Sequence, residues 1–99
     1  MTVPRTIRIL REANAGLDDR GDVLVCLSPG ELNSGIQIEI ESTLMSLFGE
    51  QIRASVLDVI EGYGLNDLKL TVRDRGALDY AIRARVQTAI ERALTEGES

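Results

Sequence analysis

The sequence contains no histidine and no tryptophan, and it has a single cysteine among its 99 residues. A zinc site built from cysteine and histidine ligands therefore cannot be assembled. A catalytic triad or a Cys–His pair is excluded as well, because the usual general base is missing. One cysteine also excludes a disulfide framework within the chain and fits a reducing, cytoplasmic compartment. These absences argue against a self-contained enzyme of the familiar kinds.

Long apolar runs are lacking too. No segment approaches the roughly 20 apolar residues that span a bilayer, so we expect no membrane-spanning helix. The first ten residues, MTVPRTIRIL, lack a basic region followed by a long apolar core, which argues against a secretory signal. The 43% hydrophobic content and the length instead indicate one globular domain.

Positive charge is scarce as well, with 16 acidic against 11 basic residues and a net charge of −5. Acidic groups repel phosphate, so we expect no nucleic-acid partner. The excess of negative charge lies in residues 31–66, which contain six acidic residues and a single basic one, Arg53. This acidic third is either a solvated surface or a face that attracts a basic partner, with Glu39 and Glu41 as the first residues to test.

What the chain does contain is a clear succession of strands and helices. Apolar residues on both faces of 23–27 predict a buried strand, with Cys26 as a small buried side chain rather than a nucleophile. Residues 28–35 are rich in turn formers and predict a hairpin loop. The strand that follows alternates Ile36, Ile38 and Ile40 with polar residues, so one of its faces is expected to be solvated.

Two helices are predicted from apolar stripes at helical spacing, over 50–63 and 78–94, with a strand at 68–72 between them. The first stripe consists of Ile52, Val56, Val59, Ile60 and Tyr63, and the second of Leu78, Ala81, Ile82, Val86, Ala89, Ile90, Ala93 and Leu94. The order β-β-α-β-α predicts an α+β two-layer sandwich, with a small, mostly antiparallel sheet and two helices on one face. Residues 1–15 are expected to be a mobile segment or an edge strand, and 96–99 a frayed tail.

The candidates for chemistry are few. Asp18, Asp19 and Asp22 cluster beside Gly21, but they lack the spacing of a calcium loop and are interpreted as a solvated turn. Arg83 and Arg85 are two residues apart on a helix and point to different sides, so they do not form one phosphate site. We expect no catalytic residue and no metal site.

The sequence and order of several motifs resemble those of the acyl carrier (gamma) subunit family of citrate lyase. The malonate decarboxylase carrier subunit is a more distant relative. The motifs are Gly21-Asp22-Val23, Phe48-Gly49, Leu57-Asp58-Val59, Tyr63, Arg75-Gly76-Ala77-Leu78-Asp79 and Arg83-Ala84-Arg85. The resemblance covers residues 16–95 and implies a non-catalytic carrier subunit. In that family a phosphoribosyl-dephospho-coenzyme A arm carries acetyl or citryl thioesters between a transferase (alpha) subunit and a lyase (beta) subunit. It thus implies a cytoplasmic phosphoprotein that works within such a complex.

One position departs from the family. The attachment serine stands immediately before the Gly-Asp pair, and this sequence has Arg20 there. Arginine has no hydroxyl and cannot form the phosphodiester, and no serine occurs between Met1 and Val25. The nearest hydroxyls in sequence are Thr6 and Ser28, with Ser34 as the most accessible substitute.

Two hypotheses follow from the resemblance, and both stay open at this point. The chain is either a carrier modified at another hydroxyl, such as Ser34 or Ser28, or a carrier-fold adaptor that has lost the arm and binds lyase-like or transferase-like partners. A small ligand-binding or independently enzymatic domain is the least supported alternative, because no convergent polar cluster is visible in the sequence.

Overall fold

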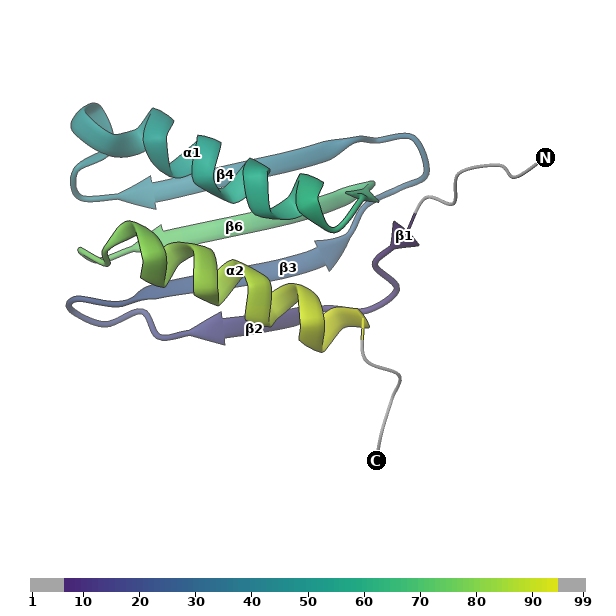
Figure 1. The fold of residues 1–99 in the computed structure, drawn as a ribbon, viewed down its shortest axis with the longest axis horizontal. Helices are drawn as coiled ribbons and strands as arrows, with labels where there is room; N and C mark the ends of the chain where they lie inside the picture. The colour runs from purple at the N-terminus through teal and green to yellow at the C-terminus, as the bar shows by residue number, and fades with distance from the viewer. Residues whose placement is uncertain (1–6, 95–99) are drawn as a thin grey trace.

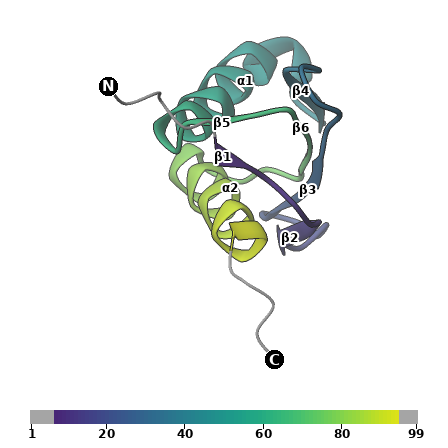
Figure 2. The same ribbon diagram turned by 90° about the vertical axis from the view of Figure 1, so that its right-hand side faces the viewer.

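A computed structural model describes residues 7–94, which form two layers, an open sheet and two helices on one of its faces (Figure 1). The elements are β1 (Ile7–Arg8), β2 (Ala13–Gly16), β3 (Val23–Pro29), β4 (Ile36–Ser42), α1 (Met45–Gly62), β5 (Leu65–Asn66), β6 (Leu68–Asp74) and α2 (Asp79–Leu94). Figure 2, turned by 90°, shows both helices on the same side of the sheet. The predicted α+β class is confirmed. The tail at 96–99 lies outside the described residues.

The four longer strands lie in the order β2-β3-β6-β4. β3 is antiparallel to β2 and to β6, whereas β4 runs parallel to β6. The predicted hairpin between 23–27 and 36–41 is therefore wrong, because β6 lies between these strands: Leu70 faces Leu27 on one side and Ile38 on the other. The edge opposite β4 is formed by β2, and the short β1 and β5 make a separate parallel pair.

Strand β3 has one buried face rather than two. Its buried side chains are Val23, Val25 and Leu27. Leu24 is half-buried and Cys26 is exposed, so the prediction of a buried Cys26 is wrong. The physical reason is that both helices cover the same face of the sheet, which leaves the face of Cys26 and Glu39 open.

The inward faces of the other strands follow the predicted alternation. In β4, Gln37, Glu39 and Glu41 are exposed, while its isoleucines pack against the core. In β6, Leu68, Leu70 and Val72 are buried. The period of two along each strand thus identified the core face correctly wherever polar residues marked the other face.

Helix α1 begins at Met45, earlier than the predicted start at Glu50. Its first turn carries Leu47 and Phe48, which are 73% and 45% exposed and so belong to no buried stripe. From Ile52 onward the predicted stripe does face the core, with Val59 and Tyr63 only partly buried. Neither helix of the described chain has the length and apolar composition that crossing a bilayer requires.

Helix α2 buries most of its predicted stripe, through Ile82, Val86, Ala89, Ile90 and Ala93. Leu78 departs from the prediction, because it precedes the helix and is 63% exposed. The core therefore lies between the helices and the sheet, and the apolar side chains at the start of each helix remain outside it.

Candidate functional site

Arg20 lies in the turn between β2 and β3, at the end of the sheet where β4 and β6 also finish (Figure 1). We call this the Arg20 end, formed by residues 17–22, 43–44 and 75–78. The side chain of Arg20 is exposed, and within residues 7–94 its guanidinium forms no ion pair. Its backbone N–H donates to the carboxylate of Asp19 at 2.7 Å. Position 20 is thus presented to solvent on a hydrogen-bonded turn.

The turn is tied to the segment that follows β6. Gly21 donates its N–H to the carbonyl of Arg75 at 2.8 Å, and Arg75 donates its own N–H to the carbonyl of Asp22 at 2.9 Å. Gly21 has a φ of +80°, a region that favours glycine. The Arg75 guanidinium binds Asp18, and Arg85 of α2 binds Asp22 through two nitrogens at 3.2 and 3.1 Å. The segment that follows β6 and helix α2 therefore hold this turn.

These contacts lower the pKa of both carboxylates. For Asp18 the main cause is the hydrogen bond from Arg75, with Arg73 adding to it. For Asp22 the main cause is the backbone N–H of Val23, followed by Arg85. The turn is exposed to solvent, as predicted, and it is also ion-paired. No group of three potential metal ligands converges within the residues that the structure describes.

The two substitute hydroxyls proposed from the sequence, Ser28 and Ser34, lie at the opposite end of the sheet. The strand register makes this clear, since Val23, beside the Arg20 turn, faces Asp74, whereas Pro29 faces Leu68. We call this opposite end, formed by residues 28–35 and 64–67, the Ser34 end. The structure therefore does not bring either serine to position 20, and Thr6 lies outside the described residues.

Ser34 and Ser28 also differ from each other in setting. Ser34 is exposed in a turn where its N–H donates to the carbonyl of Glu31 at 2.9 Å. Ser28 is half-buried on the open face of the sheet, where it pairs with Lys69. Ser34 also lies next to Gly35, whose N–H donates to the Asp67 carboxylate at 2.9 Å.

Sequence reasoning missed the hydroxyls that the fold brings to the Arg20 end. Ser42 closes β4 and donates to Asp74 at 2.9 Å, and Ser55 of α1 donates to Asp79 at 2.5 Å. Thr43 and Ser46 are exposed beside them. All four are distant from position 20 in sequence, so only the strand order could have identified them.

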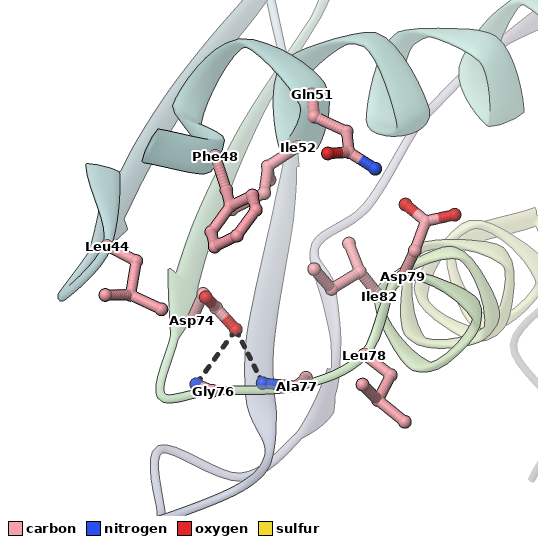
Figure 3. Close-up of a pocket in the computed structure, with 10 residues that line it drawn as sticks. All are labelled: Leu44, Phe48, Gln51, Ile52, Asp74, Gly76, Ala77, Leu78, Asp79 and Ile82. Carbon is pink, nitrogen blue, oxygen red and sulfur yellow. Dashed lines mark hydrogen bonds between the residues drawn. The ribbon is translucent and has the colours of Figure 1, made fainter. Parts of the chain in front are cut away.

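The Arg20 end also contains a cleft of about 280 Å³ between the first turn of α1 and the segment that leads into α2 (Figure 3). Its lining residues are Leu44, Phe48, Gln51, Ile52, Asp74, Gly76, Ala77, Leu78, Asp79 and Ile82. Asp74 organises one wall, because its carboxylate accepts the N–H groups of Gly76 at 3.1 Å and Ala77 at 2.9 Å. The signal for this cleft in the sequence was Phe48, an apolar residue outside both predicted helical stripes, whereas Leu78 belongs to the predicted second stripe.

Asp79 sits at the other wall with both carboxylate oxygens engaged. One oxygen accepts the hydroxyl of Ser55, and the other accepts Arg83 at 3.0 Å. The Ser55 hydrogen bond, together with Arg83, lowers the pKa of Asp79. Arg83 also binds Asp58 of α1 at 2.8 Å, so an ion pair bridges α1 and α2 next to Asp79.

Position 20 has the exposure and the fixed turn that an attachment site needs, but its guanidinium offers no oxygen for a phosphodiester. The residue present does not fit a serine-linked prosthetic group, and no chemistry is assigned to such a group on this chain.

Comparisons with known proteins cover nearly the whole chain. The family model described as ACP, malonate decarboxylase delta subunit (MdcD), matches residues 10–93. The chain is similar to the citrate lyase acyl carrier protein of Halothermothrix orenii, at 41% identity over 87 residues, 88% of this chain and 90% of the relative. That of Albidiferax ferrireducens is 43% identical over 88 residues, 89% of both chains.

The fold is also found in a solved structure. A chain in the crystal structure of a Pseudomonas malonate decarboxylase hetero-tetramer in complex with malonate superposes with a TM-score of 0.71. The match covers 92% of both chains at 20% sequence identity.

Proposed function

The chain belongs to the citrate lyase acyl carrier protein family, and on that premise we propose that it associates with transferase (alpha) and lyase (beta) type subunits or their relatives. Membership makes it a non-catalytic carrier subunit of a lyase-type complex rather than an enzyme. The absence of histidine agrees with this role, because catalysis then resides on the partners.

The observation that carries the proposal is the extent of the match. Identity near 40% spans about nine tenths of both this chain and its relatives. The ion-paired turn at residues 17–22 supports it further, because a solvent-facing segment held by Arg75 and Arg85 suits a part of the molecule that must meet partners in a fixed geometry.

The prosthetic group is where this chain departs from its family. Family carriers hold a group on a serine, and by resemblance that group is phosphoribosyl-dephospho-coenzyme A. If this chain carries it, the linkage is at another hydroxyl, of which Ser34 and Ser28 are the candidates from the sequence. Both serines lie at the Ser34 end, so an arm attached to either would start from the end of the sheet opposite Arg20.

A second candidate function is an adaptor without an arm, and Arg20 favours it. The turn retains its glycine and its ion pairs, while the residue that would bear the linkage has been replaced. Such a subunit would keep its binding surfaces and lack the carrier chemistry. The exposed, unpaired cysteine on β3 suits the reducing cytoplasm in which we place either form.

The test is co-purification followed by intact-mass measurement, using the chain expressed in its native host. Co-elution with a transferase-type or lyase-type subunit is expected. A mass increment of the arm mapped to Ser34 or Ser28 would identify a loaded carrier, and an unmodified co-purifying chain would identify the adaptor. Failure to co-purify with either subunit contradicts both.

The matched variant is Arg20→Ser, which supplies a hydroxyl at the turn. We expect it to gain the arm in that host, because the surrounding turn is held by residues other than Arg20. An unmodified Arg20→Ser chain would show that recognition of this turn has been lost along with the serine.

A further inference from the structure

Strand β4 forms the longer of the two edges of the sheet, and one side of it pairs with β6 (Figure 1). The carbonyl of Gly35, just before β4, accepts the N–H of Leu68 at 3.1 Å, so the backbone of Gly35 faces β6. Because backbone groups alternate sides along a strand, the N–H and C=O groups of Ile36, Ile38 and Ile40 point away from β6. Such an outward row of backbone groups is a template for another strand.

Arg53 of α1 covers the middle of this edge. Its guanidinium donates to the carbonyl of Ile38 at 3.2 Å, and within residues 7–94 this is the one contact that reaches the outward groups of β4. Arg53 is the only basic residue in the segment 31–66, yet among the described residues it forms no ion pair with the carboxylates of that segment. Its contact is therefore with the sheet edge rather than with the acidic side chains around it.

The opposite edge of the sheet has a matching contact. Strand β2 forms this edge, and Arg92 of α2 donates to the carbonyl of Asn14 at 2.8 Å. Each helix thus places one arginine on a carbonyl of the edge strand beside which it packs. Because β2 has four residues and β4 has seven, β4 is the edge that a further strand would extend more readily.

The hydrogen-bonding groups and charges of β4 restrict how a second copy, which brings the same edge, can pair with it. We consider antiparallel pairing about a two-fold axis. With the axis at Glu39, the two copies of Glu39 lie directly opposite each other, and with the axis at Ile40, Glu39 lies opposite Glu41. Like charges in these positions are unfavourable. With the axis at Gln37 or Ile38 the carboxylates are not opposed, and both arrangements use the carbonyl of Ile38.

We propose that Arg53 keeps the free subunit from pairing with a second copy through β4, by occupying the Ile38 carbonyl that the electrostatically permitted registers require. Glu39 disfavours the other registers, and it has no cation bound to it among the described residues. This role concerns the free subunit and goes beyond the proposed function, because it does not depend on which partners the complex contains.

The test compares the full-length wild type with Arg53→Met by sedimentation equilibrium. Methionine keeps an unbranched side chain but donates no hydrogen bond. We expect Arg53→Met to dimerise with a dissociation constant at least about tenfold lower than that of the wild type. The matched control is Arg20→Ala, which removes the same charge from an exposed arginine without an ion pair in residues 7–94, and it should associate like the wild type.

Amide hydrogen exchange locates the new contact. In Arg53→Met the N–H groups of Ile36, Ile38 and Ile40 should become protected as the protein concentration rises, because strand addition pairs them. Adding Glu39→Gln should strengthen this dimer further, because more registers become available. Circular dichroism and thermal unfolding check that each variant is folded, and Arg53→Ala, with a good helix former, serves if Arg53→Met does not fold.

Three outcomes overturn the proposal. The first is a folded Arg53→Met or Arg53→Ala chain that associates no more than the wild type. The second is a dimer in which the three isoleucine N–H groups exchange as fast as in the monomer, since that dimer would be assembled through another surface. The third is an Arg20→Ala chain that dimerises as strongly as Arg53→Met, since loss of positive charge would then be the cause.

Discussion

The two ends of the sheet are closed in the same way and differ in what they expose. Strand β6 is bracketed by Asp67 and Asp74, each of them 4% exposed. Asp74 accepts hydrogen bonds from Ser42 and the 76–77 backbone, and Asp67 accepts the N–H of Gly35 at 2.9 Å. The Arg20 end also carries an apolar cleft and a turn held by the ion pairs of Asp18 and Asp22. The buried aspartates at both ends thus serve the stability of the sheet, whereas the cleft and the ion-paired turn are features of the exposed surface.

The largest expected effect comes from removing these two carboxylates in turn. Asp74→Ala leaves three donors without their acceptor and should lower the free energy of unfolding by about 3 kcal/mol. Asp67→Ala removes the acceptor of Gly35 and places alanine at a φ of 57°, for a loss of about 2 kcal/mol. Urea unfolding at pH 7 measures both.

Asp67→Asn is the control at the Ser34 end, since asparagine tolerates this backbone conformation and keeps an oxygen acceptor. It should be less destabilising than Asp67→Ala. If Asp74→Ala proved no more damaging than Asp67→Asn, the closing role assigned to Asp74 would be wrong.

Lowering the pH is expected to have a moderate effect on the free energy of unfolding, through Asp79 at the start of α2. The pKa of Asp79 is lowered from 3.8, so the unfolded chain takes up the proton first as the pH falls. The stability contributed by its bonds to Ser55 and Arg83 is present above about pH 4 and is lost as the pH falls through the lower folded-state pKa. Asp79→Asn should therefore be less stable than the wild type at pH 6, and the difference should shrink toward pH 2–3. Urea unfolding across this pH range checks it, and a constant difference would contradict the sign.

The smallest effect concerns the open face that both ends share. Cys26 is exposed on β3, so its thiol should react fully with an aromatic disulfide reagent in the native protein, without denaturant. Cys26→Ser should change the free energy of unfolding by less than about 0.5 kcal/mol. A thiol that reacts only after unfolding would mean that a surface covers this face.

Local patterns predicted the elements well where polar residues marked one face. Strand β4 alternates isoleucine with glutamine and glutamate, and its core face was predicted correctly. Strand β3 carries Leu24 and Cys26 on its outer face, so its sequence indicated burial on both sides and was wrong about Cys26. Apolar character alone does not tell which face a helix will cover.

The predictions of the hairpin and of the substitute hydroxyls were limited for a different reason. Turn residues at 28–35 predict where the chain bends, but not that β6, far along the chain, separates β3 from β4. The same long-range pairing brings Ser42 and Asp74 to the Arg20 end and keeps Ser34 away from it. The resemblance predicted the family and the departure at Arg20, whereas the cleft needed the packing of α1 against the 76–78 segment.

The late position of β6 in the chain has a consequence for biosynthesis. β3 and β4 each pair with β6 and not with each other, so neither can complete the sheet until residues 68–74 have been synthesised. Only the β2–β3 pair can close early, from local contacts. Until then the nascent chain presents an unpaired edge of β3 and the isoleucine face of β4 to its surroundings, where a chaperone or a partner subunit can cover them.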